Sequence, residues 1–299
     1  MTTETILESP SLAPRAAGPH GVLHAMRAAL QWRLLLWWAV LLLLPTVVAA
    51  LPVWELLSAS LDHSVYATRL AERLDMIAYA DIMHGARDQY APALGAGSLV
   101  ALVLTLLLSP LLAGMALAAA RAPQPLASGA LLAAGAQCYP RLARMLAWSI
   151  VPLGVAVMMG SSAHHLAGQV AETARLEADA ERAAHLATLA TVVLLLLAHA
   201  TIDVGRAMLA ADRRRTSAIG AWWRGCGQLA RRPLALLGTY LAMTAAGLVI
   251  AALLAFARVH VPALGTVGTI GAVVLAQLVV LVLGWMRMAR LFALVALLR

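Results

Sequence analysis

The side chains best suited to chemistry lie on one short stretch, at His199, Asp203 and Arg206. Spacings of four and three residues place these side chains on one face of a helix. A histidine beside a carboxylate can transfer protons, but catalysis also needs a nucleophile or a metal, and the sequence offers neither nearby. Two interpretations stay open: a polar latch or headgroup site, and an ion pair near a helix end, of which we favour the second.

A second polar stretch combines arginines with tryptophans, namely Arg213, Arg214, Arg215, Trp222, Trp223 and Arg224. Tryptophan favours the level of the lipid headgroups, and arginine binds their phosphates. We therefore expect a surface that contacts membrane lipids, with anionic headgroups as the main partner. Docking of a protein partner, in the membrane or in the cytoplasm, is the alternative.

Recognisable cofactor and catalytic motifs are missing. Cys138 and Cys226 are the only cysteines, and they form no CxxC pair of the kind that binds metals. The sequence contains no GxxxxGK[ST], HExxH or GxSxG. We predict no cofactor, no metal site and no enzymatic activity. A lipid-processing enzyme that uses His199 and Asp203 is a third hypothesis, behind the two non-enzymatic ones given below.

The composition is that of a membrane protein. Hydrophobic residues make up 62% of the chain and charged residues 12%, against roughly 45 to 50% and about 25% in soluble domains. The formal net charge of +8 comes entirely from arginine, since there is no lysine. These arginines gather beside apolar stretches, where anionic lipids are nearer than any nucleic acid. The composition therefore argues against nucleic-acid binding.

Apolar stretches of about 20 residues predict membrane-spanning helices. Six occur, at Leu34–Leu57, Leu94–Ala120, Met145–His165, Ala184–Met208, Pro233–Phe256 and Leu264–Met288. We expect an all-α transmembrane bundle formed by residues 21–299, after a disordered cytoplasmic tail at residues 1–20. Val22 to Arg33 resembles a short interfacial helix, and Tyr66, Leu70, Leu74 and Ile77 have the spacing of an amphipathic helix outside the membrane.

The arginines also predict the orientation. Of the 22 basic residues, sixteen lie before the first span, in the second and fourth connections and after the sixth, and six lie in the other connections. Basic segments stay cytoplasmic, so both termini are expected inside. Arginine without lysine in an Ala- and Leu-rich chain is typical of GC-rich bacteria, which indicates the bacterial inner membrane.

The chain matches itself weakly at a shift of 91 positions, which pairs Gly114 with Gly205 and Arg141 with Arg232. Spans two and three would then repeat as spans four and five in a parallel repeat. Chance matching in an Ala- and Leu-rich chain is the alternative. A repeat would suit a transporter or an ABC-type permease subunit with a path between the two hairpins, and Ser128 to Leu142 could then be a coupling helix.

Thr201 to Pro233, with Asp203, Arg206, Asp212 and Arg213, resembles a segment of uncharacterised bacterial six-helix integral membrane proteins. It is also weakly similar to the membrane region of membrane-anchored glycerophosphodiesterases. The resemblance implies a six-helix bundle, but the chain lacks a phosphodiesterase domain, so no catalytic residue carries over. Our main expectation is a non-enzymatic accessory, scaffold or lipid-contacting subunit, with the transporter or permease subunit as its alternative.

Overall fold

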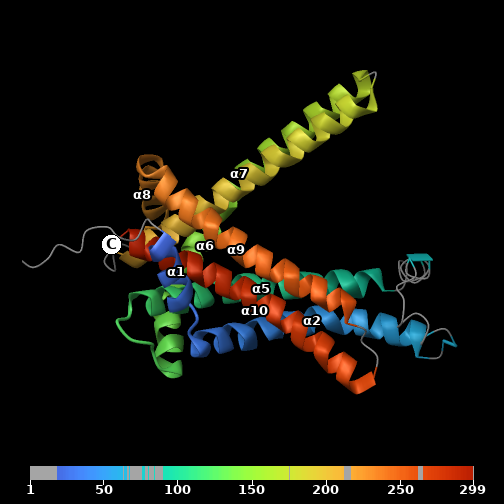
Figure 1. The fold of residues 1–299 in the computed structure, drawn as a ribbon, viewed down its shortest axis with the longest axis horizontal. Helices are drawn as coiled ribbons and strands as arrows, with labels where there is room; N and C mark the ends of the chain where they lie inside the picture. Colours follow the sequence, from blue (N-terminus) through green and yellow to red (C-terminus); the bar gives the residue numbers. More distant parts are fainter. Residues whose placement is uncertain are drawn as a thin grey trace, which may run out of the picture.

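The chain forms a bundle of long helices (Figure 1). This computed structural model describes residues 19–62, 90–174, 176–211, 217–261 and 265–298, and the single positions 64, 65, 67, 76, 77, 80 and 84. Within them, six helices are long and apolar enough to cross a membrane. They are α2 (Trp32–Leu61), α5 (Ala91–Arg121), α6 (Ser128–Thr173), α7 (Glu177–Ala211), α9 (Pro233–His260) and α10 (Gly265–Leu297). The predicted all-α bundle of six spans is confirmed.

Two short helices, α1 (Pro19–Ala28) and α8 (Ala218–Arg231), lie at one end of the bundle (Figure 1). The connection 122–127 and the last turns of α10 lie at the same end. We call it the arginine-rich end, because Arg121 ends α5, Arg231 ends α8, and Arg141 donates a hydrogen bond to the carbonyl oxygen of Leu209 near the end of α7. It is the end that the sequence predicts to face the cytoplasm.

The core is concentrated toward the arginine-rich end. The last four turns of α10 contain Met288, Leu291 and Leu294, which have no exposed surface. Met115 of α5 and Ala207 of α7 are equally buried in the same core. In contrast, the α6–α7 hairpin points away from the other spans (Figure 1). Many of its large apolar side chains, such as Met158 and Leu186, are exposed, as lipid-facing side chains are in a membrane.

Close contacts between glycines pack neighbouring helices against each other. A Cβ atom at Gly114 of α5 would lie 3.0 Å from the carbonyl oxygen of Gly135 in α6. A Cβ atom at Gly225 of α8 would lie 3.1 Å from the backbone nitrogen of Gly205 in α7. Small residues permit such approaches between helices. Gly114 and Gly205 are a matched pair of the proposed repeat, so both proposed units pack in a similar way at this point.

Several predicted boundaries differ from the structure. Helix α10 ends at Leu297, not at Met288, because apolar residues continue the helix beyond the two arginines that lowered the hydropathy. Helix α6 is one continuous helix from Ser128, so the segment Ser128 to Leu142 is not separate from the third span. Arg33 belongs to α2, because α1 ends at Ala28 and the chain passes through a turn at Ala29 and an extended residue, Gln31, before α2 begins.

Other predictions fall on residues that the structure does not describe. They include residues 1–18 of the expected tail, whereas Pro19 and His20 already belong to α1. The amphipathic pattern at Tyr66, Leu70 and Leu74 is also outside the described residues.

Candidate functional site

A buried carboxylate forms the centre of the candidate site. Asp203 of α7 is 3% exposed, and its Oδ1 accepts a hydrogen bond of 2.8 Å from Nη1 of Arg206, one turn further along the helix. Its Oδ2 lies 3.8 Å from Nη2 of Arg290, which belongs to α10. Asp203 lies eight residues before Ala211 at the end of α7, which is about 12 Å along the helix. The ion pair is therefore well inside the bundle.

Arg290 extends this group to α9. Its Nη1 donates to the hydroxyl oxygen of Tyr240 at 3.0 Å and to the hydroxyl oxygen of Thr244 at 3.3 Å. The guanidinium also lies 4.7 Å from the centre of the Tyr240 ring, a cation–π arrangement that is stronger away from water. One arginine thus joins three helices.

Arg287, one turn before Arg290, connects α10 to α5 and α2. Its Nη2 donates to the hydroxyl oxygen of Ser109 in α5 at 3.1 Å, and its guanidinium lies 5.9 Å from the ring centre of Trp38 in α2. We refer to these residues as the arginine–aspartate cluster: Asp203, Arg206, Arg287, Arg290, Tyr240, Thr244, Ser109 and Trp38. The cluster joins five of the six spans.

The cluster contains more positive than negative charge. Three arginines surround one aspartate, so its formal charge is 3 − 1 = +2. Arginine keeps its charge in proteins, and an unpaired buried charge is strongly destabilising. Each guanidinium nevertheless has a protein partner, although the Nε of Arg290 is buried without a hydrogen-bond partner among the described residues. The contacts of these arginines hold the helices together, and the excess of positive charge can attract an anion.

Two further arginines donate hydrogen bonds to the last carbonyl groups of α7. Nη1 of Arg121 in α5 donates to the carbonyl oxygen of Ala210 at 2.8 Å, and Nη2 of Arg141 in α6 donates to that of Leu209 at 2.8 Å. The last carbonyls of a helix have no partner within it, and their partial negative charge favours a cation. These contacts fix α5 and α6 against α7.

The predicted trio is only partly brought together. Asp203 and Arg206 pair, but His199 is exposed, and its Nδ1 lies 2.9 Å from the carbonyl oxygen of Leu195 in its own helix. The sequence reasoning missed Arg287 and Arg290, which it assigned to the end of the chain. Their spacing of three residues, inside an apolar stretch that continues to Leu297, is the signal that could have indicated a helix face directed at Asp203.

The predicted surface of arginines and tryptophans is also divided. Trp222 faces the bundle, where its Nε1 donates to the hydroxyl oxygen of Thr201 at 3.1 Å and its ring packs edge-on against Trp148 at 5.7 Å between centroids. Trp223 is 70% exposed, and Arg224 is half-buried. Arg213, Arg214 and Arg215 lie outside the described residues.

The described part of the chain contains no group of three or more His, Cys, Asp or Glu residues that could hold a metal ion. Cys138 and Cys226 are half-buried free thiols. Burial raises the pKa of the Cys226 thiol in α8 above its usual value, which makes the reactive thiolate less available.

Comparisons with protein-family models, with curated proteins and with solved structures find no match to this chain. The candidate site therefore rests on its own geometry.

Proposed function

We propose that the chain is a non-enzymatic protein of the bacterial inner membrane, a scaffold or lipid-contacting subunit whose arginine–aspartate cluster acts as a structural latch. One observation carries this proposal: both oxygens of Asp203 face arginines, from α7 and from α10. A general base needs a free lone pair directed at a substrate. A carboxylate enclosed by two cations suits the fixing of helices better.

The latch can be tested with a matched pair of substitutions. Asp203→Asn removes the charge of the buried pair, whereas Asp179→Asn removes the charge of an exposed pair with the same spacing, Asp179 and Arg182, 3.5 Å apart. Loss of one partner of a buried pair costs about 3 to 5 kcal/mol, and exposed pairs contribute at most about 1 kcal/mol. In lipid nanodiscs, we expect the first variant to unfold at a clearly lower temperature and the second to behave as the wild type. Equal unfolding temperatures would contradict the latch.

The scaffold or lipid role requires a partner that stays bound. Native mass spectrometry of the protein released from nanodiscs would identify retained lipids and proteins. Retained anionic lipid supports a lipid-contacting subunit, and a stoichiometric membrane protein supports a scaffold. Release of the bare chain in every lipid mixture would contradict both.

A transporter or permease subunit is the second candidate, and one feature of the fold favours it. The α6–α7 hairpin diverges from α9 and α10 (Figure 1), while the cluster joins α7 to these helices toward the arginine-rich end. In a transporter, such an arrangement would correspond to a substrate path that is closed at the arginine-rich end. Retention of an ATPase in the same mass spectra would favour this candidate.

A cysteine at position 244 tests for such a path. Thr244 is 8% exposed and bonds to Arg290. In a chain with Cys138→Ser and Cys226→Ser, a membrane-impermeant maleimide should not modify Thr244→Cys if the cluster is a static latch. Modification from either side of a sealed vesicle would show that water reaches the cluster, and would favour the transporter.

A further inference from the structure

A cavity of about 1050 Å³ opens at the arginine-rich end, away from the arginine–aspartate cluster. One wall is α1 with the first residues of α2, and the opposite wall is the connection that contains Pro123, Gln124 and Pro125. Ala119 and Ala120 of α5 and Phe292 and Ala296 of α10 complete it. Its volume is slightly above the usual range of small-molecule sites, about 300 to 1000 Å³.

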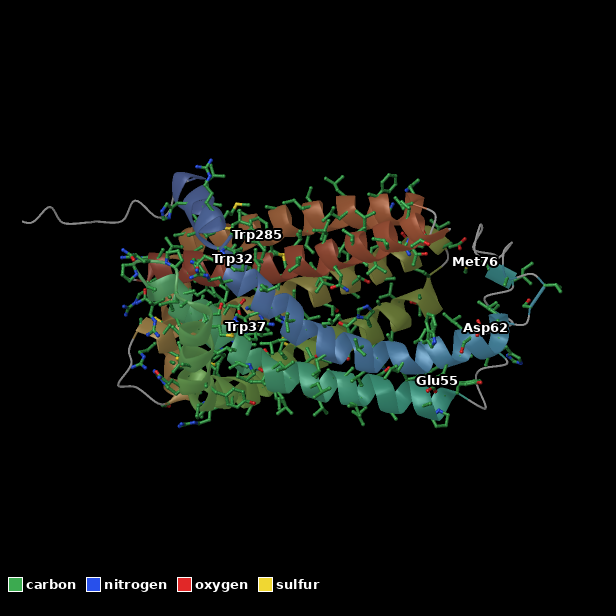
Figure 2. The ribbon with its side chains drawn as sticks, turned by 90° about the horizontal axis from the view of Figure 1, so that it is seen from below. Trp32, Trp37, Glu55, Asp62, Met76 and Trp285 are labelled. Carbon is green, nitrogen blue, oxygen red and sulfur yellow. The ribbon has the colours of Figure 1, made fainter. Side chains whose placement is uncertain are left out.

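The wall formed by α1 is fixed to the bundle. Ala25 and Ala29 are buried in the main core, and Nε1 of Trp285 in α10 donates to the carbonyl oxygen of Met26 at 3.1 Å. Figure 2 labels Trp285 beside α1, and Trp32 where α2 begins. On the other side, two prolines restrict the backbone of the connection. Both walls are therefore held in place before a ligand arrives.

The charged side chains that line the cavity are basic. Arg27 and Arg33 line it together with His24, and the lining residues that the structure describes include no aspartate or glutamate. Arg33 lies over the ring of Trp32, 5.5 Å from its centre, and neither arginine has an ion pair with a residue that the structure describes. Two guanidinium groups in the lining of one cavity, with no carboxylate among its described lining residues, are suited to an anion such as phosphate.

Helix ends at the cavity oppose this charge without cancelling it. The last turns of α1, α5 and α10 contribute lining residues, and each C-terminal end carries about −0.5 elementary charge. The N-terminal end of α2, where Gln31 provides no side-chain cap, contributes about +0.5. With two arginines, the sum is about +1 even when His24 is neutral. The cavity therefore still favours an anion.

The rim of the cavity is apolar. Leu30 and Trp32 line it and are 58% and 67% exposed, and Trp32 begins the first membrane span. Tryptophan at such a place lies at the level of the headgroups. The cavity thus combines basic lining groups with exposed apolar residues at the start of the first span, which matches a ligand with a charged head and an apolar tail.

We propose that this cavity binds a phosphate-ester anion through Arg27 and Arg33. The inference deepens the proposed function and rests on its lipid-contacting part. Two sources share this chemistry, a phospholipid headgroup that enters past Trp32 and a soluble phosphate ester from the aqueous side.

The test uses the full chain in phosphatidylcholine nanodiscs, with phosphatidic acid added to the bilayer or glycerol 3-phosphate to the buffer. Native mass spectrometry measures how much of each stays bound. The double variant Arg27→Gln and Arg33→Gln should lower retention of the ligand by at least about tenfold, because the loss of even one charge-assisted hydrogen bond lowers affinity by about that factor. The matched control is Arg231→Gln with Arg232→Gln, which removes two exposed arginines outside the cavity and should retain as much as the wild type.

A second variant keeps both arginines and fills the space. Ala296→Trp places a large ring at an exposed lining position of α10, so it should also reduce retention, and its unfolding temperature shows that the bundle is intact. This variant answers the question if the double arginine variant does not fold.

The outcomes separate the ligand sources and the two proposals. Retention of phosphatidic acid alone identifies a lipid headgroup, and retention of glycerol 3-phosphate identifies a soluble ester; both support the cavity. Equal loss in the cavity variants and in the control, or no loss in any variant, would overturn it. If the wild type holds anionic lipid that the cavity variants also hold, the cavity fails while the lipid-contacting function stands.

Discussion

Arg290 of α10 lies between the carboxylate of Asp203, 3.8 Å away in α7, and the hydroxyl of Tyr240, 3.0 Å away in α9. This contact joins residues that are 290 − 203 = 87 positions apart in the chain. Asp203 and Arg206 form an ion pair within α7, and Arg290 links this pair to a second helix, so the pair contributes to the tertiary structure.

A double-mutant cycle measures the coupling between Asp203 and Arg290. We expect Arg290→Gln and Asp203→Asn each to destabilise the bundle, and the double variant to lose less than the sum of the two. Contacting charges typically couple by about 0.5 to 3 kcal/mol. Unfolding free energies in mixed detergent micelles give the four values, and strict additivity would show that the two charges do not interact.

Tyr240→Phe removes the hydroxyl that accepts from Arg290 and leaves the ring below the guanidinium. Hydrogen bonds to charged groups contribute about 1.5 to 3 kcal/mol, so the unfolding free energy should fall by roughly that amount. The control is Tyr139→Phe, which removes an exposed hydroxyl bonded to the carbonyl of Leu107 and should cost less. A larger loss at Tyr139 would contradict the importance of the cluster.

Gly225→Ala should separate α8 from α7. The new Cβ would lie 3.1 Å from the backbone nitrogen of Gly205, which cannot move aside as a flexible side chain can. Gly227→Ala, in the same helix, meets nothing within 4 Å and should be neutral or stabilise the helix by up to about 1 kcal/mol. Thermal unfolding compares the two variants. Similar effects in both would show that the contact between α7 and α8 is not close.

The thiol of Cys226 should react only at raised pH. Burial raises its pKa above the usual 9.0, and the thiolate is the reactive form. In a Cys138→Ser chain, iodoacetamide alkylation should therefore rise at higher pH in the folded protein than in the chain unfolded by detergent. The raised pKa also means that the folded protein loses stability as the pH rises above the usual pKa of a thiol, because the unfolded chain then gives up the proton of Cys226 more readily than the folded chain does. Identical pH profiles would indicate that Cys226 is not buried.

The spans could be predicted from the sequence because their apolar stretches match the thickness of the bilayer. The pairing of Asp203 with Arg206 also followed from their spacing. Arg287 and Arg290 could not be assigned in this way, because hydropathy treats an arginine as the end of a span, whether its guanidinium faces lipid, water or a carboxylate. Trp222 shows the same limit. A tryptophan is typical of a membrane interface, but the direction of the Trp222 side chain depends on how α8 packs against Thr201 and Trp148.

The order of the helices along the chain predicts a role for the pair of Asp203 and Arg206 in biogenesis. When α7 enters the membrane during synthesis, α10 has not yet been made, so Arg206 is the partner from the same helix that can neutralise Asp203. Arg287 and Arg290 arrive later on α10, and their charges meet a carboxylate already in place. We therefore expect insertion of α10 to depend on the earlier insertion of α7, and a nascent chain that lacks Asp203 should be retained by the insertion machinery or degraded.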